Sequence, residues 1–326
     1  MNRRTVYQLG LAVLIALLVA AGGAHAEFAK VGTTGADFLK LPIGARGVGM
    51  GGAFSAISND QSAMFWNPAG MTQIGSSSVM FEHVEYFADI SYDAVGGAHR
   101  LNDTFTIGAF ALAMGSGDME VTTVQQPMGT GETFNVTNIV GGMSLGMSLT
   151  DKFSFGTNLK YVREDLDTEV ASNFAIDVGI MYDTQWNSVR LAMAVRNFGP
   201  EMQLDGGYYD FDNGSQATES TEFLPYHFPM VFRLGVAMDP LNTEQHRLTL
   251  AGDLEHPNDN IERVNLGAEY GFQKMFFLRS GYTFRHDTLG MSAGVGFLWQ
   301  RIGIDYAFSE YGVLEDVHRF NISFSF

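Results

Sequence analysis

The sequence predicts an all-β fold, a transmembrane antiparallel β-barrel of about 14 strands with an N-terminal hatch segment in its lumen. Three observations predict it. Apolar and polar residues alternate through fourteen segments, most of about ten residues, the length that a tilted strand needs to cross a bilayer. Short connections alternate with connections that include every long one along the chain. Mean hydropathy is near zero although the chain holds 38 glycines and 26 phenylalanines.

Residues 1–26 have the pattern of a secretory signal peptide. The basic stretch MNRR precedes the apolar run LGLAVLIALLVAA, and AHA forms a small-residue cleavage site before Glu27. The apolar run is short for a membrane anchor, so we expect cleavage and export to the cell envelope. We expect residues 27–75 to form the hatch and residues 76–326 to form the barrel.

The exported chain is acidic and lacks cysteine. Arg3 and Arg4 leave with the signal peptide, so 17 of the 19 basic residues remain beside 36 acidic ones, a net charge of −19. The absence of cysteine excludes disulfides, thiolate catalysis and cysteine-based zinc sites. The acidic charge argues against nucleic acid as a partner, because such binding depends on neutralising phosphates.

The strand prediction depends on a period of two. In KFSFGTNLKY, for example, Phe153 and Phe155 alternate with Ser154 and Gly156, so the two sets lie on opposite faces of a strand. Helical spacing fits none of the segments. We expect strands near 76–85, 91–100, 103–114, 134–149, 153–164, 173–183, 188–198, 229–239, 246–255, 261–272, 275–285, 289–299, 301–310 and 317–326.

The lengths of the connections favour a membrane barrel. One set holds the short links LN, TDK, TQWN, PLNTEQ, QK and QR, and the alternate set holds every long one, the longest at 199–228. Short periplasmic turns and long extracellular loops are typical of outer-membrane barrels. A soluble sandwich or barrel would also alternate, but aromatic residues at strand ends, such as Tyr161, Tyr182 and Trp299, favour the membrane.

The last residues, VHRFNISFSF, predict a closing strand whose aromatic face meets outer-membrane lipid. Phe320, Phe324 and Phe326 alternate with polar residues. This ending resembles the terminal signal that bacterial outer-membrane barrels present to the barrel assembly machinery, which makes that machinery an expected partner.

Residues 27–75 lack the strand pattern and are glycine-rich. Fourteen strands enclose a lumen too wide for strand side chains to fill, since about eight strands is the limit for that. A segment attached at the periplasmic end can fold inward as a plug. Its glycines, among them Gly47, Gly49, Gly51 and Gly52, permit close backbone packing, and Pro68 fixes a bend.

Patterns associated with cofactors or catalysis lack their structural context here. The Gly47-x-Gly49-x-x-Gly52 spacing is not part of a βαβ unit, as a dinucleotide site requires. Ser144 in GMSLG lies within an alternating strand instead of a strand-to-helix turn. The histidines show no HExxH spacing. We expect no cofactor, no metal and no enzymatic activity; an outer-membrane lipase or deacylase is the lesser alternative.

A set of arginines is expected to line the lumen. These residues lie on the polar face of their predicted strands or at strand ends. They are Arg163, Arg190, Arg196, Arg233, Arg247, Arg279 and Arg301. They either form salt bridges that hold the strands and the hatch together, or guide anionic head groups or cargo past the hatch.

The stretch LPIGARGVGMGGAFSAISNDQSAMFWNPAGM resembles the N-terminal signature of the PorV/PorQ family, a branch of the FadL-like outer-membrane proteins. Asn67, Pro68 and Ala69, between Trp66 and Gly70, match the motif in the hatch of these families. The resemblance implies a fourteen-stranded outer-membrane barrel with an N-terminal hatch.

The resemblance also implies two competing functions. One is a shuttle or gate for cargo proteins of type IX secretion, bound through the extracellular loops. The other is FadL-like transport of long-chain fatty acids or other hydrophobic small molecules. The aromatic and acidic loop at 199–228 suits either a protein partner or a hydrophobic ligand.

Overall fold

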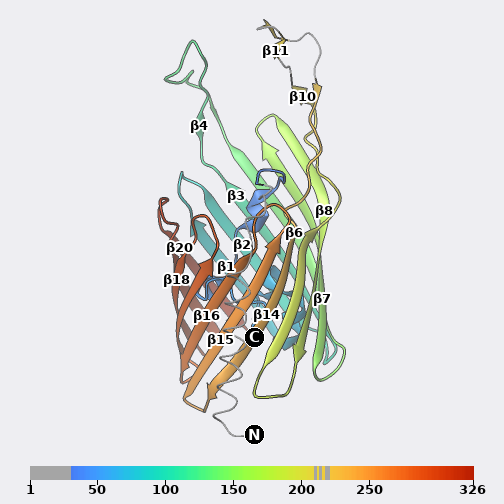
Figure 1. Ribbon diagram of the computed structural model, residues 1–326, viewed down its shortest axis with the longest axis vertical. Coiled ribbons are helices and arrows are strands. Elements are labelled where there is room, and N and C mark those ends of the chain that lie inside the picture. The colour runs from blue at the N-terminus through green and yellow to red at the C-terminus, as the bar shows by residue number, and fades with distance from the viewer. Residues whose placement is uncertain (1–30, 209–210, 213–214, 217–220) are drawn as a thin grey trace.

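The structure, a computed structural model, describes residues 31–326 apart from 209–210, 213–214 and 217–220. The predicted signal peptide lies outside the described residues. Fourteen strands close into one antiparallel barrel, which confirms the predicted fold class (Figure 1). The strands of the barrel are β1 (Ser77–Glu85), β2 (Ser91–Arg100), β3 (Phe105–Gly115), β6 (Val136–Ser148), β7 (Phe153–Leu166), β8 (Glu169–Asp183), β9 (Arg190–Phe198), β14 (Val231–Asn242), β15 (His246–Pro257), β16 (Arg263–Phe272), β17 (Phe276–Phe284), β18 (Met291–Trp299), β19 (Ile302–Ser309) and β20 (Val317–Ser325).

The barrel closes between its first and last strands. Strand β1 pairs with β20 in antiparallel register, with Phe81 opposite Ile322. Beyond the last paired residues, the backbone N–H groups of Ser77 and Phe326 each donate to the other residue's carbonyl, at 3.0 and 2.9 Å. Closure leaves no free sheet edge, which a membrane-spanning sheet requires because hydrocarbon cannot satisfy backbone hydrogen bonds.

The two faces of the wall differ as a membrane protein requires. In β8, the apolar side chains of Phe174 and Ile176 are 55% and 42% exposed, whereas Ala175 and Asp177 on the other face are at most 2% exposed. The exposed face is therefore apolar and the covered face is small or polar. This arrangement is the reverse of a soluble barrel and matches the lipid-facing alternation of outer-membrane barrels.

One irregularity changes what points inward. The pairing of β8 with β9 shifts between Ile176 and Val178, and Asn197 on β9 takes a left-handed conformation with φ of 59°. Such a bulge inserts an extra residue and turns it out of the alternation. As a result Asn197 is buried although it follows Arg196 directly.

Short turns and long loops lie at opposite ends of the barrel, as predicted. The connection between β3 and β6 carries β4 (Met119–Glu120) and β5 (Thr133–Phe134). The connection between β9 and β14 carries β10 (Gly207–Tyr208), β11 (Phe211–Asp212), β12 (Ser215–Gln216) and β13 (Thr221–Glu222). Both rise far above the barrel at the top of Figure 1, the end that corresponds to the extracellular side.

The core of the molecule is formed largely by residues 31–75, here called the inner segment. It contains the short helices η1 (Asp37–Lys40), α2 (Ala45–Gly49), α3 (Ala63–Trp66) and η2 (Pro68–Gln73). Met50, Phe54 and Trp66 are among its fully buried side chains. Among the described residues, none of the helices has the length and apolar character to span a bilayer.

Candidate functional site: the segment inside the barrel

The inner segment runs through the barrel from one mouth to the other. Near its start, the backbone of Thr34 forms an isolated β-bridge with His227 of an extracellular loop. Lys40 forms an ion pair with Asp259 in the loop between β15 and β16. Near its end, the hydroxyl of Thr72 donates to that of Ser154, the second residue of β7, at 3.0 Å. The segment therefore crosses the whole lumen before it joins β1 at the periplasmic end.

The contact at the extracellular mouth is an ion pair between Lys40 and an ionised Asp259. Burial raises the pKa of Asp259, but hydrogen bonds from Lys40 and Thr34 outweigh burial and hold the pKa below its ordinary value. The carboxylate is thus ionised at neutral pH and stays paired with the Lys40 ammonium. This pair attaches the start of the inner segment to the barrel loops.

Glycines on the wall allow backbone to pack against backbone. A Cβ atom on Gly281 of β17 would lie 2.1 Å from the carbonyl carbon of Met50, and one on Gly156 of β7 would lie 2.2 Å from the Ala69 nitrogen. Real Cβ atoms do not approach that closely. The small residues on the inner face thus serve the inner segment, because any side chain there would displace it.

The four glycines predicted in the segment lie in different surroundings. Gly51 and Gly52 have φ of 64° and 77°, a left-handed conformation that glycine adopts without strain. A Cβ on Gly47 would lie 2.8 Å from the ring of Trp66, and one on Gly49 would lie 3.1 Å from the Cα of Gly294 on the wall. Two of these glycines therefore form a turn, and the other two allow close packing.

Asn67 connects the inner segment to itself and to the wall. Its amide nitrogen donates to the carbonyl oxygens of Ser55 and Ile180, each at 3.1 Å. Its side-chain oxygen accepts from the Ala69 N–H at 3.1 Å and so caps η2, in which Pro68 takes the first position, where a missing N–H costs nothing. The Asn-Pro-Ala sequence therefore starts a short helix and binds it to β8.

The residues on either side of that sequence are fixed by close contacts. A Cβ on Gly70 would lie 1.8 Å from the Ser58 carbonyl oxygen. The Trp66 indole N–H donates to the Ile43 carbonyl at 2.5 Å, and the Arg233 guanidinium lies 5.0 Å from the centre of the Trp66 ring system. This cation–π contact links the inner segment to β14.

A chain of ion pairs connects the inner segment to β16, β17 and β19. Arg46 of α2 donates to both carboxylate oxygens of Glu269, at 2.7 and 2.9 Å, and to Asp60 at 2.9 Å. Glu269 also accepts from Arg279 at 2.8 Å, and Arg279 donates to Asp305 at 2.5 Å. Burial lowers the pKa of Arg46, but the charges of Glu269 and Asp60 outweigh it and raise the pKa. Buried ions in such a network compensate one another's lost hydration.

Carboxylates of the wall also accept backbone N–H groups of the inner segment. Glu82 of β1 accepts from Gly44 and Ala45 at 2.7 and 2.9 Å. Asp253 of β15 accepts from Ser55 at 3.0 Å. These carboxylates satisfy N–H groups that the short helices and turns leave free. Glu82 was missed in the sequence, although its inward parity on β1 was a usable signal.

Five of the seven predicted lumen arginines point into the barrel. Arg233 pairs with Glu255 at 2.9 Å, and Arg279 belongs to the network described above. Arg190 and Arg247 both approach Asp239, at 3.1 and 3.7 Å. Arg196 faces a small hollow in the lumen. Four of the five are in ion pairs, and these pairs form three separate groups, so the arginines do not form one continuous basic lining.

The lumen position predicted for two of the seven arginines was wrong. Arg163 lies on the outer face of β7, in the same alternation as Tyr161, and pairs with Asp165 at 2.8 Å. Odd-numbered residues in this part of β7 face the lipid, and the alternation in the sequence already indicated this for Arg163. Arg301 is exposed in the turn between β18 and β19, because the strand that was expected to hold it begins at Ile302.

The predicted terminal residues Phe320, Phe324 and Phe326 lie on the outer surface and are exposed. Their proposed role in assembly stays a prediction. Among the described residues, no group of three or more histidine, aspartate or glutamate side chains is placed to hold a metal ion.

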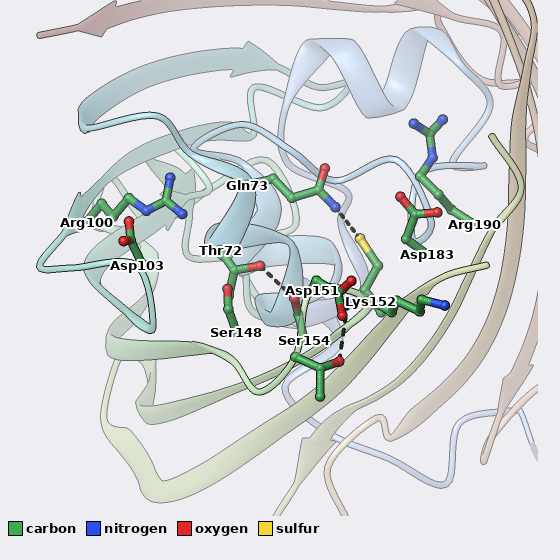
Figure 2. Close-up of a pocket in the computed structure, with 12 residues that line it drawn as sticks. Thr72, Gln73, Arg100, Asp103, Ser148, Asp151, Lys152, Ser154, Asp183 and Arg190 are labelled. Atoms are coloured by element: carbon green, nitrogen blue, oxygen red, sulfur yellow. Dashed lines mark hydrogen bonds between the residues drawn. The ribbon is translucent and has the colours of Figure 1, made fainter. Parts of the chain in front are cut away.

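The inner segment leaves little free space in the lumen. Between it and the wall lies a hollow of about 10 Å³, a volume that one water molecule fills. Leu39, Ile43 and Phe65 line it from the inner segment, and Tyr92 and Phe110 line it from the wall. At the periplasmic end, beyond Thr72 and Gln73, the barrel opens into a larger hollow of about 460 Å³ (Figure 2).

Comparison with known proteins gives a family in sequence and a fold in structure. The profile of the family described as type IX secretion system protein PorV matches residues 24–256. No curated protein matches the chain. The toluene transporter TbuX of Ralstonia pickettii has a similar structure, with a TM-score of 0.59 and 13% identity over 87% of this chain and 98% of that chain.

Two other solved structures give the same picture. The Pseudomonas putida toluene transporter TodX superposes with a TM-score of 0.59 and 12% identity, over 87% of this chain and 98% of that chain. A FadL homologue of Pseudomonas aeruginosa superposes with a TM-score of 0.55 and 14% identity, over 86% of this chain and 97% of that chain. At these identities the likeness shows the fold alone. The match to the PorV family, together with the closed fourteen-stranded barrel, identifies the chain as an integral β-barrel of the outer membrane.

Proposed function

Because this chain belongs to the PorV family, we propose that it acts in protein export across the outer membrane, as a shuttle or gate of the type IX secretion kind. In this proposal the extracellular loops bind exported cargo or other secretion components. The inner segment is a hatch that keeps the lumen closed while they do so. The protein itself carries out no chemical reaction.

The observation that carries this proposal is the filled lumen. The inner segment is held by ion pairs such as Arg46–Glu269 and by backbone contacts such as that of Met50 with Gly281. A hollow between the segment and the wall, lined by Leu39 and Phe110, has a volume of only about 10 Å³. A protein that binds partners at its loops needs no open channel, whereas a pore would have to displace these contacts.

The projecting loops supply a surface for such partners. Val124 and Met128, near the tip of the loop between β3 and β6, are 94% and 90% exposed. Large apolar side chains so far from the membrane gain nothing from lipid, and exposed apolar groups of this kind mark protein interaction sites when they gather in a patch. This loop is the part of the surface that we expect cargo to touch.

Hydrophobic transport is the second candidate, and the small hollow in the lumen favours it. Its walls are largely apolar, with Leu39 and Phe110 on opposite sides. Lys160, which is ion-paired with Asp177, and Arg196 also line it, so Arg196 is the cation that an anionic group would meet. A movement of the inner segment would enlarge it into a site for an apolar molecule with an anionic group. Solved proteins of the same fold are described as toluene transporters and as a monoaromatic hydrocarbon channel.

A deletion strain complemented with matched variants separates the two functions. One variant replaces the loop tip at 121–130 with a short glycine–serine link, and a second substitutes Leu39→Trp to fill the lumen hollow. We measure the secreted and surface proteome together with uptake of labelled long-chain fatty acid and toluene. Export predicts that loss of the gene or of the loop tip depletes surface proteins, while Leu39→Trp has no effect.

The opposite pattern would overturn the export proposal. If deletion abolished uptake and left the secreted proteome unchanged, and if Leu39→Trp reproduced that loss, transport would be the function. Heat-dependent migration on gels provides the folding control for each variant, because stable barrels migrate differently before and after boiling.

A further inference from the structure

The hollow at the periplasmic end is bounded by three neighbouring turns and by the end of the inner segment. Arg100 is the last residue of β2, Asp103 lies in the β2–β3 turn, and Asp151 and Lys152 lie in the β6–β7 turn. Asp183 lies at the end of β8, before the β8–β9 turn. Figure 2 shows Arg100 and Asp103 on one side and Asp183 with Arg190 on the other, with Thr72 and Gln73 between them. The volume of the hollow, about 460 Å³, falls within the range of small-molecule sites.

The charges around this hollow are arranged differently from those in the lumen. Arg190 is paired with Asp239. For the other charged residues around the hollow, the described part of the chain offers no oppositely charged group within 4.0 Å. They are Arg100, Asp103, Asp151, Lys152 and Asp183. Two cations and three anions therefore surround the hollow without direct ion pairs to one another.

Local backbone geometry holds these charges in place. The Asp183 carboxylate accepts the Gln185 N–H at 2.8 Å, and the Gln185 side chain donates to Asp151 at 3.2 Å. The Thr150 hydroxyl accepts the Lys152 N–H at 3.2 Å. These bonds fix the Asp183 and Asp151 carboxylates and the backbone that carries Lys152 before any ligand arrives. Such preorganisation lowers the free energy that binding would spend on ordering the site.

The lining selects the chemistry of a ligand. A site of this kind offers no apolar wall for a fatty acid or an aromatic hydrocarbon, since most of its side chains are charged or carry a hydroxyl or amide. A purely anionic ligand would meet three carboxylates, and a purely cationic one would meet two cations. A molecule with both signs of charge, separated along a short chain, gains from each set.

We propose that this hollow binds a short zwitterionic peptide of about two or three residues, a size that suits a small-molecule site. Its free carboxylates would contact Lys152 and Arg100, and a side-chain ammonium would contact Asp183 and Asp151. The stem peptides of the cell wall, which lies on this side of the outer membrane, have this chemistry. The proposal concerns the end of the barrel opposite the extracellular loops and does not depend on the export role.

The test is titration calorimetry on the purified full-length barrel in detergent micelles. The probe is the tripeptide Ala–Glu–diaminopimelate with free carboxylates and a free side-chain amine. The same peptide with its amines acetylated and its carboxylates amidated serves as the neutral comparison. We expect saturable binding of the charged peptide, weakened at least fivefold in 0.5 M salt because the contacts are ionic.

Two pairs of variants localise the binding. Lys152→Gln and Asp183→Asn should each weaken it at least fivefold. Lys274→Gln and Glu244→Gln remove the same charges from exposed turns at the same end of the barrel and should leave binding unchanged. Circular dichroism and heat-dependent migration on gels confirm that each variant is folded.

Three results would overturn the proposal. They are the absence of saturable binding, equal binding of the charged and neutral peptides, and equal losses in the Lys152 and Lys274 variants. A positive result with an intact secreted proteome in the gene deletion would separate this site from the export proposal.

Discussion

The inner segment and the periplasmic hollow both contain many charged groups, but they use them in opposite ways. Arg46, Glu269, Arg279 and Asp305 form one buried chain of ion pairs inside the barrel. Next to the end of the same segment in space, Lys152 and Asp183 face a hollow and have no ionic partner among the described residues. The first set holds two parts of the chain together, and the second set is free to meet something else.

The difference shows what charge does in each environment. In the lumen, removing water from an ion is costly unless a partner replaces it, so every buried cation of this network has a carboxylate. At the periplasmic mouth, water remains available and an unpaired charge costs little. Pairing therefore indicates a role in holding the fold, whereas the unpaired charges at the hollow remain available to a ligand.

Gly281→Val should give the largest effect, because it acts where backbone meets backbone. A Cβ there would lie 2.1 Å from Met50, so the inner segment must move. Overpacking that displaces only side chains typically costs about 1–3 kcal/mol, and because backbone must move here we expect a loss above that range and above the losses of the variants below. We expect a lower thermal unfolding midpoint and higher permeability of cells to small hydrophilic antibiotics.

Gly141→Val is the matched control for that variant. Gly141 has no atom within 4 Å of an added Cβ, so neither measurement should change. Equal behaviour of the two variants would contradict the view that the wall glycines exist to accommodate the inner segment.

Arg46→Ala should have the next largest effect. It leaves Asp60 without an ion-pair partner and leaves Arg279 as the only ion-pair partner of Glu269. Breaking a buried pair by removing one partner costs about 3–5 kcal/mol, and some relaxation of the inner segment toward the periplasm will reduce this. The thermal midpoint in detergent and the permeability of cells measure the effect. Arg163→Ala, on the outer face, should change neither. A normal midpoint for Arg46→Ala would show that the ion-pair chain does not hold the segment.

Asn67→Ala should have a smaller effect. It removes two donated hydrogen bonds and the cap of η2, which leaves the Ser55 and Ile180 carbonyls without this donor. The expected loss of stability is about 1–3 kcal/mol. Limited proteolysis from the periplasmic side should cut the inner segment faster in this variant than in Asn242→Ala, whose asparagine is exposed. Unchanged cleavage would argue against Asn67 as an anchor.

Lys152→Gln should have the smallest effect on stability, within about 0.5 kcal/mol, as for most surface substitutions. Its thermal midpoint should match that of the unchanged protein, although the proposed peptide site would be lost. A destabilisation as large as that of Arg46→Ala would mean that the hollow is part of the structural network, and the comparison made above would fail.

Much of the barrel could be predicted from the sequence because a strand in a membrane wall has a simple periodicity. The position of each residue along a strand decides whether it meets lipid or lumen, so Phe174 and Asp177 could be assigned to opposite faces without any tertiary information. The same rule, applied to Arg163, would have placed it outside. The bulge at Asn197 breaks the rule, since its extra residue follows no period.

The sequence by itself thus determined the number of strands, their approximate positions and the faces of most of their side chains, because each depends on neighbours along the chain. Only the tertiary structure decided which wall residue each part of the inner segment meets. Arg46 and Glu269 are separated by more than two hundred residues, and nothing local indicates that they pair. The hollow at the periplasmic end has the same origin, since Thr72 and Gln73 of the inner segment meet the wall residues at the ends of β2, β6 and β8 only inside the folded barrel.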